Sequence, residues 1–470
     1  MWLGDIADSL GRTVEGVTGA VNEALFEPTI RLGVTGLSRA GKTVFITSLI
    51  ANLLDRSRMP GLAAAADGRV RAAYLQPQPD DTVPRFEYET HLSALLGPEP
   101  IWPDSTRSVS ELRLSLRLQP AGLIGSVSGP RRLHLDIVDY PGEWLLDLGL
   151  LEVDFTEWSS RALTAMEGKP FATAYLERLA ATSPGERLVE TEAQDLAGTY
   201  TEYLHSARAS GFSNIAPGRF LLPGDLAGSP ALTFAPLPPS AAARGSLARE
   251  MARRFEAYKT LVVKPFFRDH LSRIDRQVVL IDALGALARG PAATADLIDA
   301  MGGILSAFRP GRNAFLAQIF LGKRVEKILF AATKADTLHH SQHVALASVA
   351  EALARAARDR ADFAGAGTSS MAIAALRTTT EETREEGGAS LDMVRGRVVG
   401  RDGLVAVYPG TLPASGSEVV AAATANAESW PWGDVEAMDF LPQPLRLSPG
   451  EGPPHIRLDR AAEFLFGDRL

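Results

Sequence analysis

Eight consecutive residues carry the clearest chemistry in this sequence. Residues 36–43 read Gly-Leu-Ser-Arg-Ala-Gly-Lys-Thr, which matches the phosphate-loop pattern G-x-x-x-x-G-K-[ST]. In such a loop, backbone N–H groups at the start of a helix wrap a polyphosphate. Lys42 adds a positive charge at the β and γ phosphates, and the Thr43 hydroxyl ligates Mg²⁺. We therefore predict that phosphates contact Ser38, Arg39, Ala40, Gly41, Lys42, Thr43 and Val44.

A second candidate element follows an apolar run that ends at Asp139. Residues 139–142 read Asp-Tyr-Pro-Gly, a D-x-x-G switch element. The Asp139 carboxylate can hold a Mg²⁺-bound water. The Gly142 N–H can approach a γ phosphate because glycine has no Cβ. Behind a buried strand and downstream of a phosphate loop, this tetrapeptide predicts a second edge of the same nucleotide site.

Two further segments are candidates for reading the base. Residues 333–336 read Thr-Lys-Ala-Asp and resemble the [NT]-K-x-D motif that reads guanine. The Asp336 carboxylate can accept from two guanine donors, which adenine lacks, while the Lys334 stem packs over the base. A surface charge and helix cap at these two positions is the alternative.

The second base-side segment is residues 371–376, an apolar run rich in alanine. Its small residues would let the backbone amides of Ala375 and Leu376 approach the base. Ala374 and Leu376 stand where the S-A-K element of GTPases has serine and lysine. A plain core strand therefore remains an alternative for this run.

A GTPase also needs a threonine, upstream of the strand that leads to the D-x-x-G element, which closes over Mg²⁺ and the γ phosphate. Thr106 lies just before the alternating strand pattern at residues 111–118, in the position expected of switch I. Ser105 is the local rival, and an ordinary loop hydroxyl is the other interpretation. We predict that Mg²⁺ is held by Thr43, Thr106 and, through water, Asp139.

Strands and helices must place these groups at one edge of a sheet. Residues 28–35 and 44–54 read as the strand and the apolar helix that flank the phosphate loop. Residues 111–118 and 131–139 predict a hairpin, because their apolar side chains alternate and a glycine-rich stretch joins them. Residues 277–282 predict a further parallel strand, and residues 292–308 the helix that crosses over from it.

The spacing of these motifs predicts the domain organisation. The chain between Asp139 and Lys334 is several times longer than two strand–helix units of roughly 30 residues each. The excess is rich in Ala, Leu, Glu and Arg at helical spacing, which predicts a helical insertion. We predict an amino-terminal amphipathic helix, a first core part, a helical insertion domain, a second core part and a carboxyl-terminal region at residues 1–27, 28–150, 151–275, 276–377 and 378–470.

These motifs together resemble the YcjX-like family of bacterial P-loop NTPases over nearly the whole chain. The resemblance implies a cytoplasmic, stress-linked protein of the translation-factor-like GTPase class. It also implies an α/β fold, with a Ras-like core, a mixed and mainly parallel sheet, a large helical insertion and a small carboxyl-terminal α+β region. The segments that carry it are residues 36–47, 102–107, 139–144, 263–268, 276–282, 333–336 and 456–468.

Glu143 follows the D-x-x-G glycine, where many Ras-like GTPases have a glutamine that orients the attacking water. Its negative charge would lie near a γ phosphate that gains charge during hydrolysis. We therefore expect slow intrinsic hydrolysis unless an arginine neutralises the site. Arg39, Arg107 or an arginine of the insertion could do so. The predicted catalytic set is Lys42, Thr106, Gly142, Glu143 and Arg39.

Composition narrows the class of protein. The 470 residues include no cysteine, which excludes disulfides, thiolate metal sites and a cysteine nucleophile. The net charge of −8 argues against a general nucleic-acid binder, which needs a basic surface. No apolar run approaches the ~20 residues of a membrane span, so we expect a cytoplasmic protein. His339 and His340 are expected to begin a solvated helix, because no third ligand is spaced to complete a metal site.

The amino-terminal segment has an apolar stripe at helical spacing, from Leu3 to Leu25, and acidic residues on its other face. Anionic membranes would repel that face, so we expect the stripe to pack on the core or on a partner helix. Peripheral membrane contact is the alternative.

The sequence thus predicts a Mg²⁺-dependent enzyme that hydrolyses GTP to GDP and phosphate, with switches coupled to a helical insertion. Two alternatives remain: a nucleotide-gated interaction module with negligible turnover, and an ATPase. We expect an effector or activating protein, whose identity the sequence does not give.

Overall fold

The computed structural model describes residues 27–470 apart from a few short gaps. The predicted amino-terminal helix lies outside the described residues except for Glu27. Three other predicted residues also lie outside them: Ser38 of the phosphate loop, Ser105, which was the alternative to Thr106, and Arg107, which was a candidate for the neutralising arginine. The gaps are Ser38, Ser105, Arg107, Ala364 and residues 121–130, 241–242, 307–324, 387–388 and 426–429.

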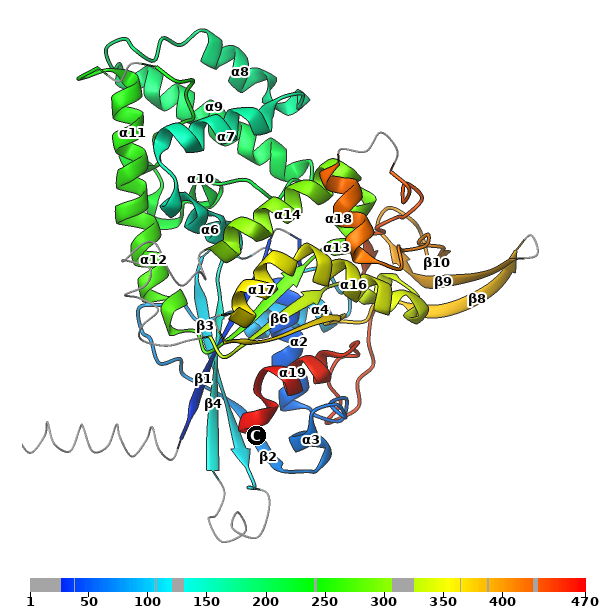
Figure 1. Cartoon of the computed structure of the whole chain (residues 1–470). Helices are drawn as coiled ribbons and strands as arrows, with labels where there is room; N and C mark the ends of the chain where they lie inside the picture. Colours follow the sequence, from blue (N-terminus) through cyan, green and yellow to red (C-terminus); the bar gives the residue numbers. More distant parts are fainter. Residues whose placement is uncertain are drawn as a thin grey trace, which may run out of the picture.

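The central sheet of the described chain has seven strands in the order β2-β3-β4-β1-β5-β6-β7 (Figure 1). Strands β4, β1, β5, β6 and β7 run parallel, while β2 and β3 are antiparallel to their neighbours. This arrangement confirms the predicted α/β fold with a mixed, mainly parallel sheet and a Ras-like core. The strands are β1 Thr29–Gly36, β2 Val70–Gln76, β3 Ser110–Leu118, β4 Arg131–Asp139, β5 Arg276–Ile281, β6 Lys327–Ala332 and β7 Gly367–Ala372.

The inner strands are buried because helices cover both faces of the sheet. Every residue of β5 is buried, as expected for a parallel strand between two helix layers. The predicted hairpin of β3 and β4 is confirmed, with Leu114 opposite Leu135. The helices of the core are α2 Lys42–Leu54, α3 Ala63–Ala66, α4 Tyr88–Leu96, α6 Glu143–Leu146, α13 Ala283–Ala288, α14 Pro291–Ser306, α16 His343–Leu353 and α17 Arg355–Phe363.

A group of helices stands on one end of the core, between β4 and β5 in the chain (top of Figure 1). Its interior is aromatic: Trp158 stacks on Phe255 with ring centroids 5.0 Å apart, and Phe234 packs edge-on against Trp158. The helical character expected for this stretch is therefore observed. The helices are α7 Phe155–Met166, α8 Thr173–Ala180, α9 Glu190–Ala209, α10 Gly218–Leu221, α11 Leu247–Tyr258 and α12 Lys264–Asp269.

The carboxyl-terminal part forms a second, four-stranded sheet and two helices. Strand β9, Ala389–Val398, pairs with all three other strands of this sheet, β8 Thr380–Glu386, β10 Leu404–Val407 and β11 Phe440–Leu441. Helix α18, Gly416–Thr424, packs against α16 and α14. Helix α19, Leu458–Phe466, returns to the central sheet and buries Ala461, Leu465 and Phe466.

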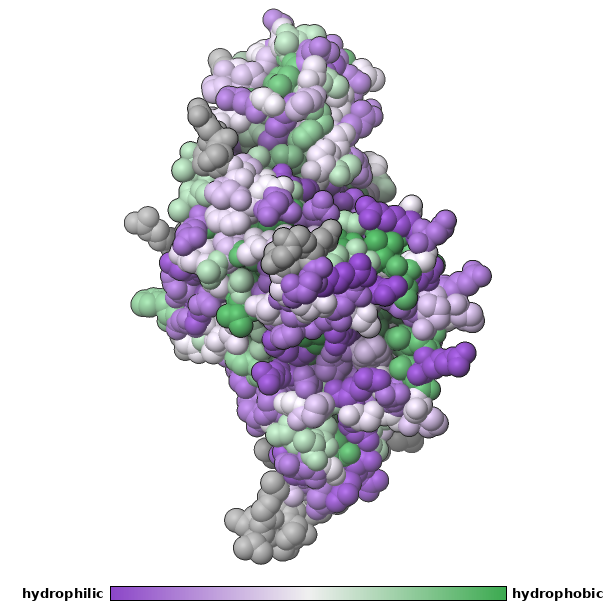
Figure 2. All heavy atoms as spheres, turned by 90° about the vertical axis from the view of Figure 1, so that its right-hand side faces the viewer, coloured by the Kyte–Doolittle hydropathy of each residue, from purple (hydrophilic) through white to green (hydrophobic). Residues whose placement is uncertain are grey.

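Three strands were not anticipated: β2, β8 and the two-residue strand β11. Strand β2 is only partly buried at the sheet edge, and β8 lies in a stretch that reads simply as polar. Both edges are solvated, so their sequences lack the continuous apolar run that identifies an inner strand. The face seen in Figure 2 is mostly hydrophilic, with apolar residues in separate small patches. Among the described residues, no helix is both long and apolar enough to cross a membrane.

Candidate nucleotide site

The phosphate loop runs from the end of β1 to the start of α2. Gly41 precedes the helix with φ = 82°, a conformation that favours glycine, and Arg39 also has a positive φ of 66°. The Lys42 side chain is buried and its Nζ donates to the Gly36 carbonyl at 2.9 Å. The loop therefore turns back on its own first residue and points the amino end of α2 into the site.

Gly142 of the D-x-x-G element touches the same carbonyl. A Cβ added at Gly142 would lie 2.0 Å from the Gly36 oxygen, which is shorter than any real contact of this kind. Its φ of −63° is ordinary, so close approach and not backbone conformation requires glycine here. The phosphate loop and the D-x-x-G element are thus packed directly against each other.

Three predicted Mg²⁺ ligands lie at the ends of these elements. The Thr106 hydroxyl donates to Asp139 Oδ2 at 2.7 Å, and the Thr43 hydroxyl lies 3.4 Å from the Asp104 carbonyl. Burial raises the pKa of the Asp139 carboxyl to about 6. Asp139 Oδ1 is buried and has no hydrogen-bond partner within the described chain. A buried carboxylate oxygen without a partner, on a carboxylate that the Thr106 hydroxyl contacts, fits the oxygen ligands that Mg²⁺ prefers.

Glu143 is buried beside the phosphate loop and pairs with an arginine of the helical group. Its Oε1 lies 3.0 Å from Arg208 Nη2, near the end of α9. The Glu143 side chain is 2% exposed and the Arg208 side chain 21% exposed. Because Arg208 and Arg39 both line the pocket that contains Lys42, three cations surround the site of the expected phosphates.

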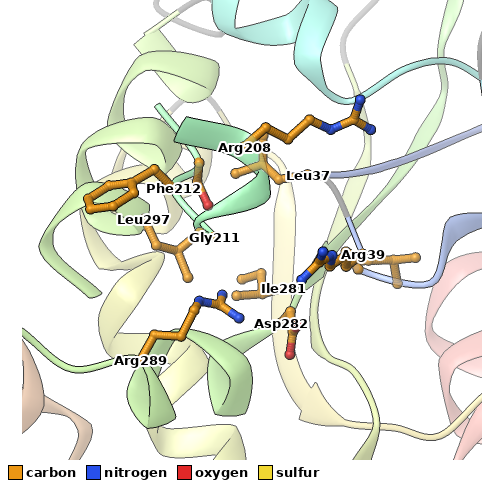
Figure 3. Close-up of a pocket in the computed structure, with 12 residues that line it drawn as sticks. Leu37, Arg39, Arg208, Gly211, Phe212, Ile281, Asp282, Arg289 and Leu297 are labelled. Atoms are coloured by element: carbon orange, nitrogen blue, oxygen red, sulfur yellow. The ribbon is translucent and has the colours of Figure 1, made fainter. Parts of the chain in front are cut away.

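A small cavity lies between the end of α9 and the phosphate loop (Figure 3). Leu37 and Arg39 line it from the loop, Arg208 and Leu297 line it from α9 and α14, and Phe212 lines it from the segment after α9. Its volume is about 20 Å³, which has room for about one water molecule. Arg208 therefore lies where the helical group meets the phosphate loop.

The motif predicted to read the base lies after β6. Lys334 adopts a left-handed φ of 59°, and its Nζ lies 2.9 Å from Asp282 Oδ2. The Asp336 carboxylate is buried, and burial raises its pKa. Its Oδ2 accepts from the Thr378 N–H at 2.8 Å and from the Thr378 hydroxyl at 2.7 Å. Asp336 is thus held in place by the chain that follows β7, rather than standing as a solvated surface charge.

The small-residue run after β7 forms part of the same wall. Ala374 exchanges backbone hydrogen bonds with Ile456 at 3.0 and 2.8 Å, so its amide is occupied. Ala375 and Leu376 line the pocket, as does Phe440 of β11. The Trp102 indole donates to the Phe440 carbonyl at 2.8 Å. The segment that carries Thr106 is thereby tied to the carboxyl-terminal sheet.

One pocket of about 470 Å³ brings most of the predicted residues together. Asp139 and Gly142 do not line it directly; Asp139 contacts it through Thr106. Ser38 lies outside the described residues. The predicted residues that line the pocket are Arg39, Ala40, Gly41, Lys42, Thr43, Val44, Thr106, Glu143, Lys334, Asp336, Ala375 and Leu376.

Comparison with known proteins agrees with this arrangement. The family model described as "YcjX-like family, DUF463" matches residues 30–470. The chain belongs to the YcjX-like family. The "Ras-like GTPase YcjX" of Escherichia coli (strain K12) is 36% identical over 456 residues, covering 94% of this chain and 96% of that protein. The protein of the same name from Shewanella oneidensis (strain MR-1) is 33% identical over 470 residues, covering 94% of each chain.

Several residues that line the pocket of this YcjX-like chain were not among the site residues predicted from its sequence. Arg208, Trp102 and Thr378 lie outside the motifs or beside them, and residues 438–440 come from the last part of the chain. Trp102 lies in residues 102–107, which carry part of the family resemblance, and that resemblance could have identified it as a pocket residue. Arg208 gives no local signal, because it is one of many arginines on solvated helices.

Proposed function

We propose that this protein binds guanine nucleotide with Mg²⁺ and hydrolyses GTP to GDP and phosphate. The observation that carries the proposal is the convergence of a phosphate loop and a buried Thr-Lys-Ala-Asp carboxylate on one pocket. The names of the two relatives, both Ras-like GTPases, support the same choice. An ATPase is disfavoured because adenine lacks the pair of N–H donors that guanine would offer to the buried Asp336 carboxylate.

The proposed phosphate contacts use the backbone of residues 38–44 together with the Lys42 ammonium. The Lys42 ammonium donates to the Gly36 carbonyl at 2.9 Å. When nucleotide binds, it would donate to phosphate oxygens instead, and the loop backbone would stay in place. The Gly142 N–H would meet the γ phosphate. At the other end, Asp336 would accept from the base while Lys334 packs its stem over it.

Mg²⁺ would be held by Thr43 and Thr106, with Asp139 acting through water. When bound, the ion would neutralise charge on the β and γ phosphates. The Thr106–Asp139 hydrogen bond keeps the switch I segment beside this place before any ion binds. The nearby Oδ1 of Asp139, which has no hydrogen-bond partner in the described part of the chain, is available to a metal-bound water.

Arg208 is our candidate for the arginine that offsets Glu143. It is the pocket arginine whose ion pair with Glu143 is observed, at 3.0 Å. Arg39 is the other arginine of the described pocket lining and remains the alternative. If Arg208 shifted from Glu143 to the γ phosphate, the helical group would supply charge stabilisation in cis.

The Glu143–Arg208 pair also favours a rival function. A buried acid in place of a water-orienting glutamine suits a nucleotide-gated interaction module with negligible turnover. In that case the pair would transmit the state of the nucleotide to the helical group without hydrolysis. Both proposals require the same binding pocket, so turnover separates them.

Single-turnover hydrolysis of GTP tests the catalytic proposal. Arg208→Ala should slow the reaction by at least about tenfold, and Glu143→Gln should speed it. The double variant identifies the role of the arginine. If Arg208 only neutralises Glu143, its removal should have little effect in the Glu143→Gln background; if it contacts the γ phosphate, the loss should persist. Parent turnover at zero, unchanged by Glu143→Gln, would favour the interaction module.

The division into five segments at residues 1–27, 28–150, 151–275, 276–377 and 378–470 remains part of this proposal. So does its cellular setting, a cytoplasmic bacterial stress response, which the family resemblance alone supports. We propose that the D-x-x-G switch element moves the helical insertion, because α6 begins at Glu143 and leads directly into the helices of that insertion. Hydrogen exchange of residues 145–275 with GDP and with a GTP analogue would test this coupling.

A further inference from the structure

Side chains that commonly ligate metals gather beside the base end of the nucleotide pocket. His339, His340 and Glu381 each offer one ligand atom, and these atoms all lie within 4.8 Å of one another. The two histidines follow the 3₁₀ turn at Ala335–Thr337, and Glu381 lies on β8. The sequence shows only the histidine pair, because folding of the β8–β9 hairpin supplies the third ligand.

The distances between these atoms are close to those of a metal site. His340 Nδ1 lies 2.7 Å from Glu381 Oε2, and His339 Nε2 lies 3.8 Å from the same oxygen. The ring centroids of the two histidines are 4.2 Å apart. Around a tetrahedral Zn²⁺ with bonds of ~2.0 to 2.2 Å, ligand atoms lie about 3.3 Å apart. The observed distances lie on either side of that value, so small side-chain rotations are enough to form the site.

Asp392 on β9 provides the supporting contact that a metal-bound histidine needs. Its Oδ2 lies 3.2 Å from His339 Nδ1, which also lies 2.9 Å from the Ser341 hydroxyl and 3.4 Å from the Ser341 N–H. His339 Nδ1 accepts from the Ser341 N–H in this structure. Metal bound at Nε2 would select the tautomer with the proton on Nδ1, which would then donate to Asp392 instead. Asp392 is paired with Thr383, two residues after Glu381, so the pleat places both carboxylates on one face of the hairpin.

The cluster is closed on one side and open on the other. The His339 side chain is 10% exposed and Glu381 21% exposed, whereas His340 is 68% exposed. Arg377 lies 3.5 Å from Glu381 Oε1, so the other oxygen, Oε2, faces the histidines. An ion can therefore enter from solvent, and water can complete its coordination.

We propose that His339 Nε2, His340 Nδ1 and Glu381 bind one divalent transition-metal ion, with Zn²⁺ as the expected metal. Two imidazoles and one carboxylate suit Zn²⁺, whereas Mg²⁺ prefers oxygen ligands alone. The ion would join the segment that follows Asp336 to the β8–β9 hairpin. Thr378 and Thr379, which bond Asp336, lead directly into β8, so the ion would fix the support of the base-reading carboxylate.

Calorimetric titration with Zn²⁺ tests this site independently of nucleotide. The full chain, without a polyhistidine tag and stripped with chelator, would be titrated in excess Mg²⁺ so that the proposed oxygen-ligand site is occupied. We expect one saturable Zn²⁺ per chain. His340→Ala and Glu381→Gln should each weaken binding at least about tenfold, and Asp392→Asn should weaken it by about 10 to 100-fold.

Two control variants change the same residue types outside the proposed ligands, one on the same strand and one in the helical group. Glu385→Gln changes an exposed acid on the same face of β8, and His205→Ala changes an exposed histidine of α9. Both controls should keep the parent affinity, and Co²⁺ should give visible absorption bands that are lost in His340→Ala. No saturable Zn²⁺ binding, or equal binding by the parent, His340→Ala and Glu381→Gln, would overturn the proposal.

Discussion

The two ends of the nucleotide pocket hold their polar groups in different ways. At the phosphate end, Lys42 is held by the backbone of its own loop, on the Gly36 carbonyl. At the base end, Asp336 is held by Thr378, which comes from the far side of β7. Local chain geometry therefore positions the first group and tertiary packing positions the second. We expect substitutions at the phosphate end to act on binding directly and those at the base end to act partly through supporting contacts.

The largest expected effect is at Lys42. Lys42→Ala should weaken GDP and GTP alike, by about 3 kcal/mol, because its charge would serve both nucleotides. Equilibrium binding of fluorescent GDP and of a GTP analogue would measure this. Lys327→Ala, at the amino end of β6, is the matched control, and equal losses in both variants would show a general effect of removing a lysine.

Thr106→Ala should act on the triphosphate alone. Switch I closes on the γ phosphate, so GTP analogue affinity should fall by about 1 to 2 kcal/mol while GDP affinity stays at the parent value. The same binding assay applies. Identical losses for the two nucleotides would show that the Thr106–Asp139 contact is structural and that another group closes over the γ phosphate.

Thr378→Val would test the support at the base end. The substitution keeps the backbone N–H that bonds Asp336 and removes the hydroxyl, so affinity for GDP and GTP should fall together by about 1 kcal/mol. Thr379→Val is the companion variant, because its hydroxyl bonds the Asp336 carbonyl instead of the carboxylate. Guanine selectivity reduced only by Thr379→Val would contradict the role given to Thr378.

The smallest expected effect is a pH-dependent change in stability at Asp147, where the core meets the helical group. Asp147 accepts from the Gly218 N–H at 2.7 Å and from the Tyr258 hydroxyl. Burial raises its pKa from the ordinary 3.8 to about 7. The folded state then binds the proton more tightly than the unfolded state, so this group's contribution to stability is lost as pH rises from about 4 to 7.

Chemical denaturation of the parent and of Asp147→Asn across this range would measure that loss. The free energy of unfolding of Asp147→Asn, relative to the parent, should rise from pH 4 to 7 and then level off. A difference between the two proteins that does not change with pH would show that Asp147 keeps an ordinary pKa.

The sequence predicted the elements whose identity depends on local pattern. Strands β5 and β6 have nearly continuous apolar runs, and β3 and β4 have alternating apolar residues. The phosphate loop is a contiguous motif that the sequence shows directly. The placement of Thr106 beside Asp139 also followed, because the β3–β4 hairpin fixes where its preceding loop must lie. Recognition of the family resemblance agreed with these local signals.

The remaining features depend on contacts between distant segments. Arg208 meets Glu143 only because the helical group folds back onto the phosphate loop. His339 and His340 gain Glu381 only when β8 forms, and β8 reads as a polar stretch. Phe440 closes the base end from the last part of the chain. No periodicity or spacing in one segment encodes which other segment will pack against it.

Base preference tests the central claim most directly, because it requires both ends of the pocket to bind one molecule. Titration calorimetry of the parent should favour GTP over ATP by about 2 to 4 kcal/mol, since adenine lacks the two N–H donors that guanine offers to the buried Asp336 carboxylate. Asp336→Asn should shift the preference towards xanthine nucleotide. Equal affinity of the parent for GTP and ATP, with no gain of xanthine nucleotide binding in Asp336→Asn, would contradict the account.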